Sequence, residues 1–319
     1  MKPHYEKVTV VAPARLHMGF IDLSGALGRH FGSIGLALND INTHVTVTSS
    51  SSLIVNGPCA ERASQAARRL CQLLNLPEQF QIDLSAAIPE HIGLGSGTQM
   101  SLAIGAGLNA FYGLGLSVRE IAKLADRGAR SGIGIGVFEQ GGLVVDGGRG
   151  TDTETPPLLS RMMVPEHWRF ILAFDQRGQG LHGEQEVSAF QKLPPFPRSE
   201  AERLCYLLLM QALPAIAEQN LALFGDVITQ LQDSVGQHFA PVQGGVFTSP
   251  EVATAMSWLQ QQGAVAIGQT SWGPTGFCAV DDPNKALELL SDLQRCFTSE
   301  HLSFQVVSAR NLAADISCY

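Results

Sequence analysis

The chain has 319 residues, of which 45% are hydrophobic and 16% charged, and a formal net charge of −8 at pH 7. It can therefore bury an ample apolar core, as one large domain or two of ordinary size. No run of Lys or Arg is present, which argues against a nucleic-acid partner. No N-terminal signal pattern and no window of ~20 apolar residues is found, so we expect a cytoplasmic protein without membrane contact.

The first half of the chain predicts strands and helices separated by glycine-rich loops. We expect strands at 8–12, 44–48 and 81–87, helices at 60–74 and 98–111, and a glycine-rich connection at 25–35. Ser117 and Glu120 form the capping-box pattern that starts a further helix. Six cysteines without a C-x-x-C pair argue against a zinc site or a disulfide framework.

The second half predicts a similar mixture, after a glycine-rich tract at 128–150 in which only 143–145 resembles a strand. The Pro-containing stretch at 151–165 is the expected domain boundary. Beyond it we expect strands at 170–174, 264–267, 277–280 and 303–307, and helices at 201–218, 221–232, 250–262 and 285–296. The layout is α+β.

The segment Pro89-Glu-His-Ile-Gly-Leu-Gly-Ser-Gly-Thr98 lies between an expected strand and an expected helix. Its alternating glycines allow backbone N–H groups to converge on an anion, and the helix N-terminus adds a partial positive charge. The hydroxyl groups of Ser96 and Thr98 supply further donors. We predict a phosphate-binding loop, with a glycine-rich turn chosen for close packing as the alternative.

Three motifs resemble the GHMP kinase superfamily, which includes galactokinase, homoserine kinase and mevalonate kinase. They are Ala12 to Gly19, the loop from Pro89 to Ser96, and Gly268-Gln-Thr-Ser-Trp-Gly-Pro-Thr-Gly276. The resemblance implies a ribosomal-S5-like N-terminal domain at 1–160 and a ferredoxin-like C-terminal domain at 161–319, with the ligand between them.

The sequence departs from the kinases at two positions. Many GHMP kinases have Ser-Gly-x-Asp where this chain has Ser131-Gly-Ile-Gly134, so the aspartate beside the acceptor hydroxyl is replaced by Gly134. Gly97 also replaces a serine that kinases place near the metal. Since phosphoryl transfer depends on positioned charge, both changes argue against kinase activity.

A closer resemblance is to the β-ribofuranosylaminobenzene 5′-phosphate synthase family. It is carried by the stretches Arg15 to Asp22, Gly28-Arg29, Phe31 to Gly35, Gly132 to Gly142 and Ser271 to Thr275. The resemblance implies condensation of a para-substituted benzoate, 4-aminobenzoate or 4-hydroxybenzoate, with phosphoribosyl pyrophosphate. Carbon dioxide and pyrophosphate are released, in the biosynthesis of methanopterin-type one-carbon cofactors. It also implies Mg²⁺ and a homodimer.

The reaction suggests roles for residues in these motifs, in the glycine loop, and for Arg177, which follows the expected strand at 170–174. Asp22 and Glu139 are candidates to stabilise positive charge on the ribose, or to hold Mg²⁺, and His17 to carry a proton. The expected substrate- and phosphate-binding residues are Arg15, Arg29, Gly93, Leu94, Gly95, Ser96, Gly97, Thr98, Arg177, Gln269, Ser271 and Thr275. The expected lining of an apolar arene pocket is Phe20, Phe31, Phe138 and Trp272.

Structural rather than functional interpretations of these residues remain open. The two carboxylates also fit surface or loop-capping positions, His17 a structural histidine, and Arg177 an ordinary ion pair with Asp175. At the level of the whole protein, an ATP-dependent small-molecule kinase and a non-catalytic sugar-phosphate sensor are the competing functions.

Overall fold

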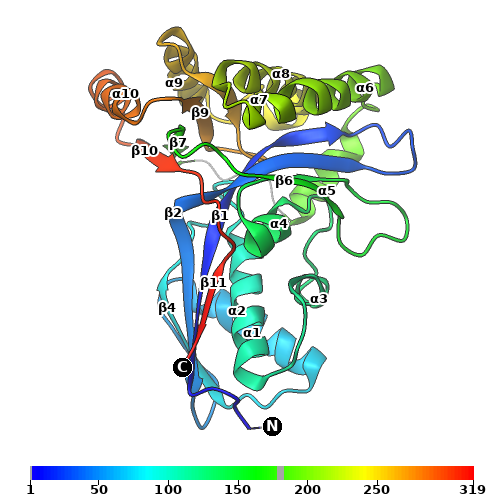
Figure 1. The fold of residues 1–319 in the computed structure, drawn as a ribbon, viewed down its shortest axis with the longest axis vertical. Helices are drawn as coiled ribbons and strands as arrows, with labels where there is room; N and C mark the ends of the chain where they lie inside the picture. The colour runs from blue at the N-terminus through cyan, green and yellow to red at the C-terminus, as the bar shows by residue number, and fades with distance from the viewer. Residues whose placement is uncertain (1, 178–182) are drawn as a thin grey trace.

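Two β-sheets organise the chain (Figure 1), in a computed structural model that describes residues 2–177 and 183–319. The larger sheet has the order β11-β1-β2-β4-β3, and β5 and β6 extend it from β2. Its strands are β1 (Lys7–Asp22), β2 (Phe31–Ser49), β3 (Ile54–Asn56), β4 (Phe80–Ala86), β5 (Leu143–Asp146), β6 (Leu158–Met162) and β11 (Asp315–Cys318).

Four helices accompany this sheet: α1 (Ala60–Leu74), α2 (Ser96–Tyr112), α3 (Val118–Leu124) and α4 (Ile133–Gln140). Helix α2 packs against β1 and β2, because its small residues allow a close approach. A Cβ atom at Gly107 would lie 2.9 Å from Val47 Cγ2, which is tighter than ordinary contact. The close packing of α2 fixes the position of its N-terminus, where the glycine loop ends.

The smaller sheet has the order β10-β7-β9-β8. Its strands are β7 (Arg169–Asp175), β8 (Val265–Gln269), β9 (Gly276–Val280) and β10 (Leu302–Ser308). The remaining helices are α5 (Gly183–Lys192), α6 (Arg198–Leu207), the π-helix η1 (Leu208–Ala212), α7 (Leu213–Ala217), α8 (Leu221–Gln243), α9 (Pro250–Gln261) and α10 (Pro283–Cys296).

Helix α8 joins the two halves of the molecule, since it contacts both β8 and β1. One apolar core contains Leu16 and Leu36 of the larger sheet together with Phe224 and Leu231 of α8. The two sheets therefore share a core along α8. In the part of the chain that the structure describes, no helix is long and apolar enough to cross a bilayer.

The expected α1 is confirmed at 60–74, and Ser117 and Glu120 form the expected capping box. Strands β1 and β2 are longer than predicted, so the glycine-rich connection shrinks to a hairpin tip at 23–30. Within the glycine-rich tract, α4 was not predicted. It forms because Ile133, Ile135, Val137 and Phe138 are buried, and buried apolar contacts outweigh the low helix propensity of glycine.

The last strand, β11, was also missed, and it pairs with β1 rather than with the smaller sheet. The stretch 151–165 contains β6, which still belongs to the first sheet, and β11 returns to that sheet after the smaller one is complete. The division of the chain at residue 160 thus leaves the C-terminal residues on the N-terminal sheet.

Candidate ligand site at the glycine loop

The glycine loop leads directly into α2, as its sequence suggests. Gly93 and Gly95 both have φ of 81°, in the left-handed region that favours glycine. Gly95 is the N-cap of α2 and provides no side-chain cap, and the first turn of the helix contains no acidic residue. Ser96 and Leu94 are buried, whereas Gly97 and Thr98 are partly exposed. The helix terminus therefore has a positive potential that no side chain of its own first turn neutralises.

Three distant segments of the chain meet at this loop. Arg15 Nη1 donates to the carbonyl oxygen of Gly93 at 2.5 Å. The Thr270 hydroxyl also donates to Gly93 O, at 2.9 Å, and accepts from the backbone N–H of His17 at 3.0 Å. The N-terminal, loop and C-terminal motifs thus form one site, between the two sheets.

His17 is the most unusual side chain of the site. It is only 2% exposed, and within residues 2–177 and 183–319 neither ring nitrogen has a hydrogen-bond partner. Burial, aided by the nearby positive charge of Arg15, holds the pKa of His17 well below its usual 6.5, so the imidazole is neutral at pH 7. Unpartnered buried polar atoms are rare in proteins and often mark a ligand position.

A small cavity of about 20 Å³ adjoins His17 and is lined in part by Phe20, Phe239 and Trp272. The ring of His17 lies 4.8 Å from that of Phe20, edge to face, and the ring of Trp272 lies 4.4 Å from that of Phe239. The cavity has room for about one water molecule. Its walls combine these aromatic rings with the side chains of Gln232, Gln243 and Gln269, so the imidazole faces a small, partly aromatic cavity rather than bulk solvent.

The three predicted residues of the C-terminal motif have different surroundings. The Gln269 side-chain oxygen accepts from the backbone N–H and hydroxyl of Thr248, at 2.7 and 2.9 Å. Ser271 has φ of 55° and lines the small cavity. Thr275 is fully buried, and its hydroxyl has no hydrogen-bond partner among the residues that the structure describes. Ser271 and Gln269 therefore both line the cavity, and Gln269 also orders the neighbouring loop.

Gly134, which replaces the kinase aspartate, lies directly against the glycine loop. A Cβ atom at this position would be 2.9 Å from Thr98 Cγ2. Gln99 of α2 donates from its amide nitrogen to Gly134 O at 2.7 Å, which holds α4 against α2. A carboxylate at residue 134 would therefore point at the first turn of α2, and this chain has none there.

Sequence reasoning missed a buried carboxylate, Asp146, at the end of β5. It accepts from the backbone N–H groups of Gly132 at 2.9 Å and Gly148 at 2.8 Å, and from the hydroxyls of Ser33 and Ser131. Burial raises the pKa of Asp146, and the four hydrogen bonds oppose that rise. With all these donors satisfied, the carboxylate fixes the start of α4. Its position after an apolar strand was the only signal in the sequence.

The two predicted carboxylates, Asp22 and Glu139, lie away from the glycine loop. Asp22 is seven residues beyond Arg15 on β1, roughly 20 Å along an extended strand. One of its oxygens accepts from the N–H and hydroxyl of Ser24, at 2.7 and 2.6 Å. Glu139, near the opposite end of α4 from Gly134, pairs with Arg119 at 3.3 Å. The structure does not bring Asp22 and Glu139 together.

Arg29 is likewise engaged within the hairpin region. Its Nε donates to Gly147 O and its Nη2 to Gly148 O, both at 3.0 Å. These bonds hold the tip of the β1–β2 hairpin against the loop that follows β5. In this arrangement Arg29 is a structural residue, and the structure does not place it at the glycine loop.

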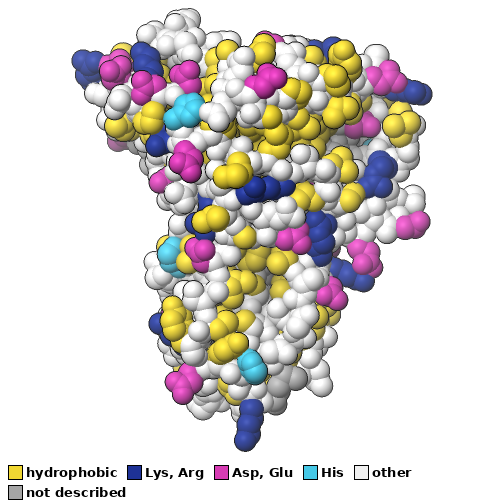
Figure 2. Space-filling model, in the orientation of Figure 1, with side chains coloured by type: hydrophobic (Ala, Val, Ile, Leu, Met, Phe, Trp, Pro, Cys, Tyr) yellow, Lys and Arg dark blue, Asp and Glu magenta, His cyan; other side chains and the backbone are white. Residues whose placement is uncertain are grey.

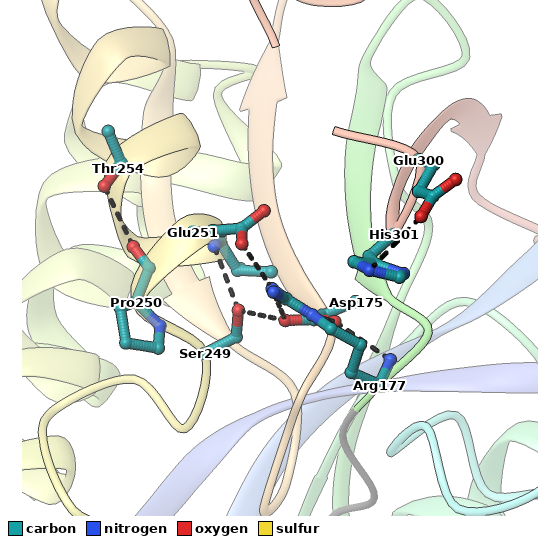
Figure 3. A network of polar contacts seen from close by, with 9 residues as sticks. Asp175, Arg177, Ser249, Pro250, Glu251, Thr254, Glu300 and His301 are labelled. Atoms are coloured by element: carbon teal, nitrogen blue, oxygen red, sulfur yellow. Dashed lines mark hydrogen bonds and ion pairs between the residues drawn. The ribbon is translucent and has the colours of Figure 1, made fainter. Parts of the chain in front are cut away.

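Arg177 belongs to a network at the end of β7 (Figure 3). Its Nε and Nη2 donate to the two carboxylate oxygens of Asp175 at 3.0 and 2.9 Å, and Nη2 also pairs with Glu251 at 2.6 Å. Ser249 donates its hydroxyl to Asp175 at 2.7 Å. The ion pair with Asp175, which was the alternative interpretation of the sequence, is present. We therefore assign Arg177 no role in binding phosphate.

We expect Asp175→Asn to lower the free energy of unfolding by about 1 kcal/mol at pH 7, since solvent screens the half-exposed partner Arg177. Hydrogen bonds from Arg177 hold the pKa of Asp175 at about 2, below its ordinary 3.8, although burial opposes this. The stabilisation is therefore complete above about pH 4 and is lost as the pH falls towards 2. Urea unfolding at pH 7 and pH 3 measures it, with Asp292→Asn on the surface of α10 as control. An undiminished difference between wild type and Asp175→Asn at pH 3 contradicts this linkage.

An open cleft of about 560 Å³, lined in part by Phe31, Phe190 and Phe196, lies on the other side of the aromatic residues. Phe20 connects it to the His17 cavity, with ring centroids 5.6 Å from Phe31 and 6.3 Å from Phe190. The expected Phe20, Phe31 and Trp272 therefore belong to one aromatic cluster. Phe138 does not, because it is buried in the separate core around α2.

The residues fit a resident Mg²⁺ poorly. Among residues 2–177 and 183–319, no group of three or more His, Cys, Asp or Glu side chains could hold a metal ion. Asp22 and Glu139 are far apart in the fold and already have partners. We derive no step of the chemistry from a metal held by this chain.

The fold and both halves of the site have counterparts in known proteins. The family model described as the GHMP kinases N terminal domain matches residues 61–141, and that described as GHMP kinases C terminal matches residues 212–299. The solved mevalonate kinase of L. major superposes with a TM-score of 0.70 at 13% identity, covering 97% of this chain and 98% of that one. Homoserine kinase from Cytophaga hutchinsonii gives 0.63 at 15% identity, covering 99% of each chain. These similarities show the fold alone.

Closer relatives are enzymes named β-ribofuranosylphenol 5′-phosphate synthase. The chain is 34% identical to that of Archaeoglobus fulgidus over 290 residues, which are 86% of this chain and 88% of the relative. It is 30% identical to that of Methanothermobacter thermautotrophicus over 298 residues, 86% of this chain and 89% of the relative. This chain is therefore an enzyme of the β-ribofuranosylphenol 5′-phosphate synthase family, within the GHMP kinase superfamily.

Proposed function

We propose that this enzyme condenses 4-hydroxybenzoate with phosphoribosyl pyrophosphate, releasing carbon dioxide and pyrophosphate. One observation carries the proposal: a glycine loop at the N-terminus of α2, without a kinase carboxylate, lies next to His17 and an aromatic cluster. A kinase site needs charge beside an acceptor hydroxyl, whereas this site offers a phosphate cradle next to an apolar surface. We place the reaction in the biosynthesis of methanopterin-type cofactors, as the family resemblance suggests.

The donor is proposed to lie along the glycine loop. Its phosphate groups would accept from the backbone N–H groups at the start of α2 and from the hydroxyl of Thr98. Arg15, already bonded to Gly93 O, keeps the loop in shape and adds positive charge beside it. Mg²⁺ is proposed to arrive with the pyrophosphate, since Mg²⁺ is commonly bound through substrate phosphates.

The arene is proposed to bind in the aromatic cluster, with its para group directed at His17. A phenolic hydroxyl can donate to a ring nitrogen of the neutral imidazole, which satisfies a buried polar atom. The relatives' name contains phenol, which favours 4-hydroxybenzoate over 4-aminobenzoate. The carboxylate would lie against aromatic rings, where poor hydration favours its loss as neutral carbon dioxide.

The proposed reaction balances without a further reagent. The ring carbon that bears the carboxylate bonds to the anomeric carbon, while the bond to pyrophosphate breaks and the leaving group keeps its electron pair. The bond to the carboxylate carbon then breaks, and its electrons restore the aromatic ring. The hydrogen bond from the para hydroxyl to His17 increases electron density on the ring as the new bond forms.

We propose that neither Asp22 nor Glu139 stabilises positive charge on the ribose. Asp22 lies roughly 20 Å along β1 from Arg15 at the glycine loop, and Glu139 is occupied by Arg119. Asp22→Ala and Glu139→Ala should therefore both keep kcat within about twofold of the wild type, as measured by steady-state kinetics. A fall in kcat of tenfold or more in either variant would give that carboxylate a part in the reaction.

The decisive experiment supplies the enzyme with phosphoribosyl pyrophosphate, Mg²⁺ and arene labelled at the carboxylate carbon. Labelled carbon dioxide should appear in stoichiometric amounts with pyrophosphate, faster from 4-hydroxybenzoate than from 4-aminobenzoate. Formation of ADP from ATP and a small alcohol, with no carbon dioxide from either arene, would instead show the kinase. Binding of the donor without turnover would show the sugar-phosphate sensor.

A homodimer is proposed for the assembled enzyme. Figure 2 shows hydrophobic side chains gathered over α7 and α8, on one face of the molecule. The exposed large apolar residues of this region include Tyr206, Leu209, Met210 and Leu223, with Leu209 63% exposed. Exposed apolar patches commonly mark protein interfaces. Light scattering on the wild type and on Leu209→Glu should give dimer and monomer masses respectively.

A further inference from the structure

A second cavity, of about 260 Å³, lies beside the start of α2, on the side facing α1 and the end of α3. Three arginines line it: Arg62 and Arg69 of α1, and Arg127, three residues beyond α3. Gly97 of the glycine loop forms part of its wall. The cavity is therefore continuous with the phosphate-binding loop, although sequence reasoning assigned nothing to these arginines.

The positive charge of this cavity is incompletely balanced within the protein. Arg62 forms an ion pair with Glu90. Arg69 lies 4.0 Å from Asp126, and the side chains of Arg69 and Asp126 are both more than half exposed. Arg127 is partly buried and donates from Nε and Nη2 to the hydroxyl of Ser101, at 3.2 and 3.1 Å. Its pKa is lowered by burial and then by the charge of Arg62, which indicates mutual repulsion.

Gly97 allows these guanidinium groups to approach the helix. A Cβ atom there would overlap Nη2 of Arg62 and lie 3.7 Å from Nη1 of Arg127. In this chain the space that a serine side chain at residue 97 would occupy in the kinases is thus taken by the guanidinium group of Arg62. The guanidinium groups and the positive end of α2 repel one another unless an anion lies between them.

We propose that Arg62, Arg69 and Arg127 form the subsite for a pyrophosphate group, next to the glycine loop. Pyrophosphate carries more charge than orthophosphate and has enough oxygens to accept from several planar guanidinium groups at once. The identification of this anion as the donor's leaving group rests on the proposed function. In that arrangement the ribose extends from the subsite along the loop towards His17 and the aromatic cluster.

The chain offers close controls for each arginine. Arg68 is adjacent to Arg69 on α1 and exposed, but does not line the cavity. Glu90 competes with any anion for Arg62, so Glu90→Gln should leave Arg62 free to bind it. Arg62→Lys keeps the charge and loses the planar fork.

Titration calorimetry with inorganic pyrophosphate tests the subsite without requiring turnover. We expect Arg62→Gln and Arg127→Gln to weaken binding at least tenfold each, Arg69→Gln and Arg62→Lys by a smaller factor, and Arg68→Gln by less than twofold. Glu90→Gln should strengthen it, and orthophosphate should bind at least tenfold more weakly than pyrophosphate. Circular dichroism confirms folding, and since Arg62 is a third exposed, its variants remain informative if Arg127→Gln does not fold.

Two results would overturn the subsite. One is pyrophosphate binding that is equal in wild type, Arg62→Gln and Arg62→Lys, or absent at millimolar concentration. The other is ADP binding much more tightly than pyrophosphate with the same arginine dependence, which would show a nucleotide subsite. Labelled carbon dioxide release in the wild type, measured separately, reports on the proposed function alone, so the two ideas can fail independently.

Discussion

Replacing His17 by Gln should lower kcat by about 10²- to 10³-fold, within the range that positioned acid–base groups contribute. The imidazole is buried, neutral and unpartnered, and the proposed para hydroxyl of the arene is the group that would bond to it. Because that bond strengthens as charge develops on the ring, kcat should fall more than KM for the arene rises. The backbone N–H of residue 17 keeps its bond to Thr270 in the variant, so the loop is preserved.

His44→Gln on β2 is the control, and it should keep full activity. A His17→Gln variant with wild-type kcat and an unchanged melting temperature rules out the assignment. Stability gives a second readout, because the unfolded chain binds a proton near pH 6.5 that folded His17 does not. Wild-type stability should therefore decline as the pH falls below 6.5, and His17→Gln should decline less over the same range.

Gly93→Ala should both destabilise the protein and abolish most of the activity. With φ of 81°, any Cβ costs about 1–2 kcal/mol, and here it would also lie 2.5 Å from the carbonyl oxygen of Thr270. The loop can relieve that overlap only by moving away from the C-terminal motif, which breaks the bonds that Gly93 O accepts from Arg15 and Thr270. We expect at least about 2 kcal/mol more destabilisation than the φ cost alone.

Gly115→Ala isolates that φ cost. Gly115 has φ of 71° and no atom within 4 Å of a built Cβ, so its variant has the strain without the overlap. Urea unfolding compares the two free energies, and carbon dioxide release compares their kcat/KM for phosphoribosyl pyrophosphate. Equal destabilisation of the two variants would show that contact between the loop and Thr270 contributes nothing to the free energy of unfolding.

Several local elements and the glycine-rich motifs could be read from the sequence. Helix α1 follows from its apolar face, and the start of α3 follows from the Ser117 and Glu120 pair, because both signals act within a few residues. The glycine loop was recognisable for the same reason. Helix α4 was not, since its glycines hide a helix whose stability comes from burial against the rest of the fold.

The roles of individual charged residues were less accessible. Glu139 is in a motif that resembles the family and Arg177 follows an expected strand, yet the partners that the fold gives them are Arg119 and Asp175. Asp146 looked like the end of a strand, but it is a buried carboxylate that fixes the start of α4. The partner of a charged group depends on residues far away in sequence, which spacing along the chain does not reveal.

By itself, the sequence determined the family, the α+β class, the position of the glycine loop before α2 and the presence of Gly134 where kinases have a carboxylate. These follow from short-range patterns of glycine, apolar and capping residues. Only the tertiary structure decided that Arg15, His17 and Thr270 meet at Gly93, that the His17 imidazole is buried without partners, and that three arginines from α1 and the end of α3 face Gly97. Such features arise when distant segments pack together, because burial and neighbouring charge, rather than residue type, set what a side chain can do.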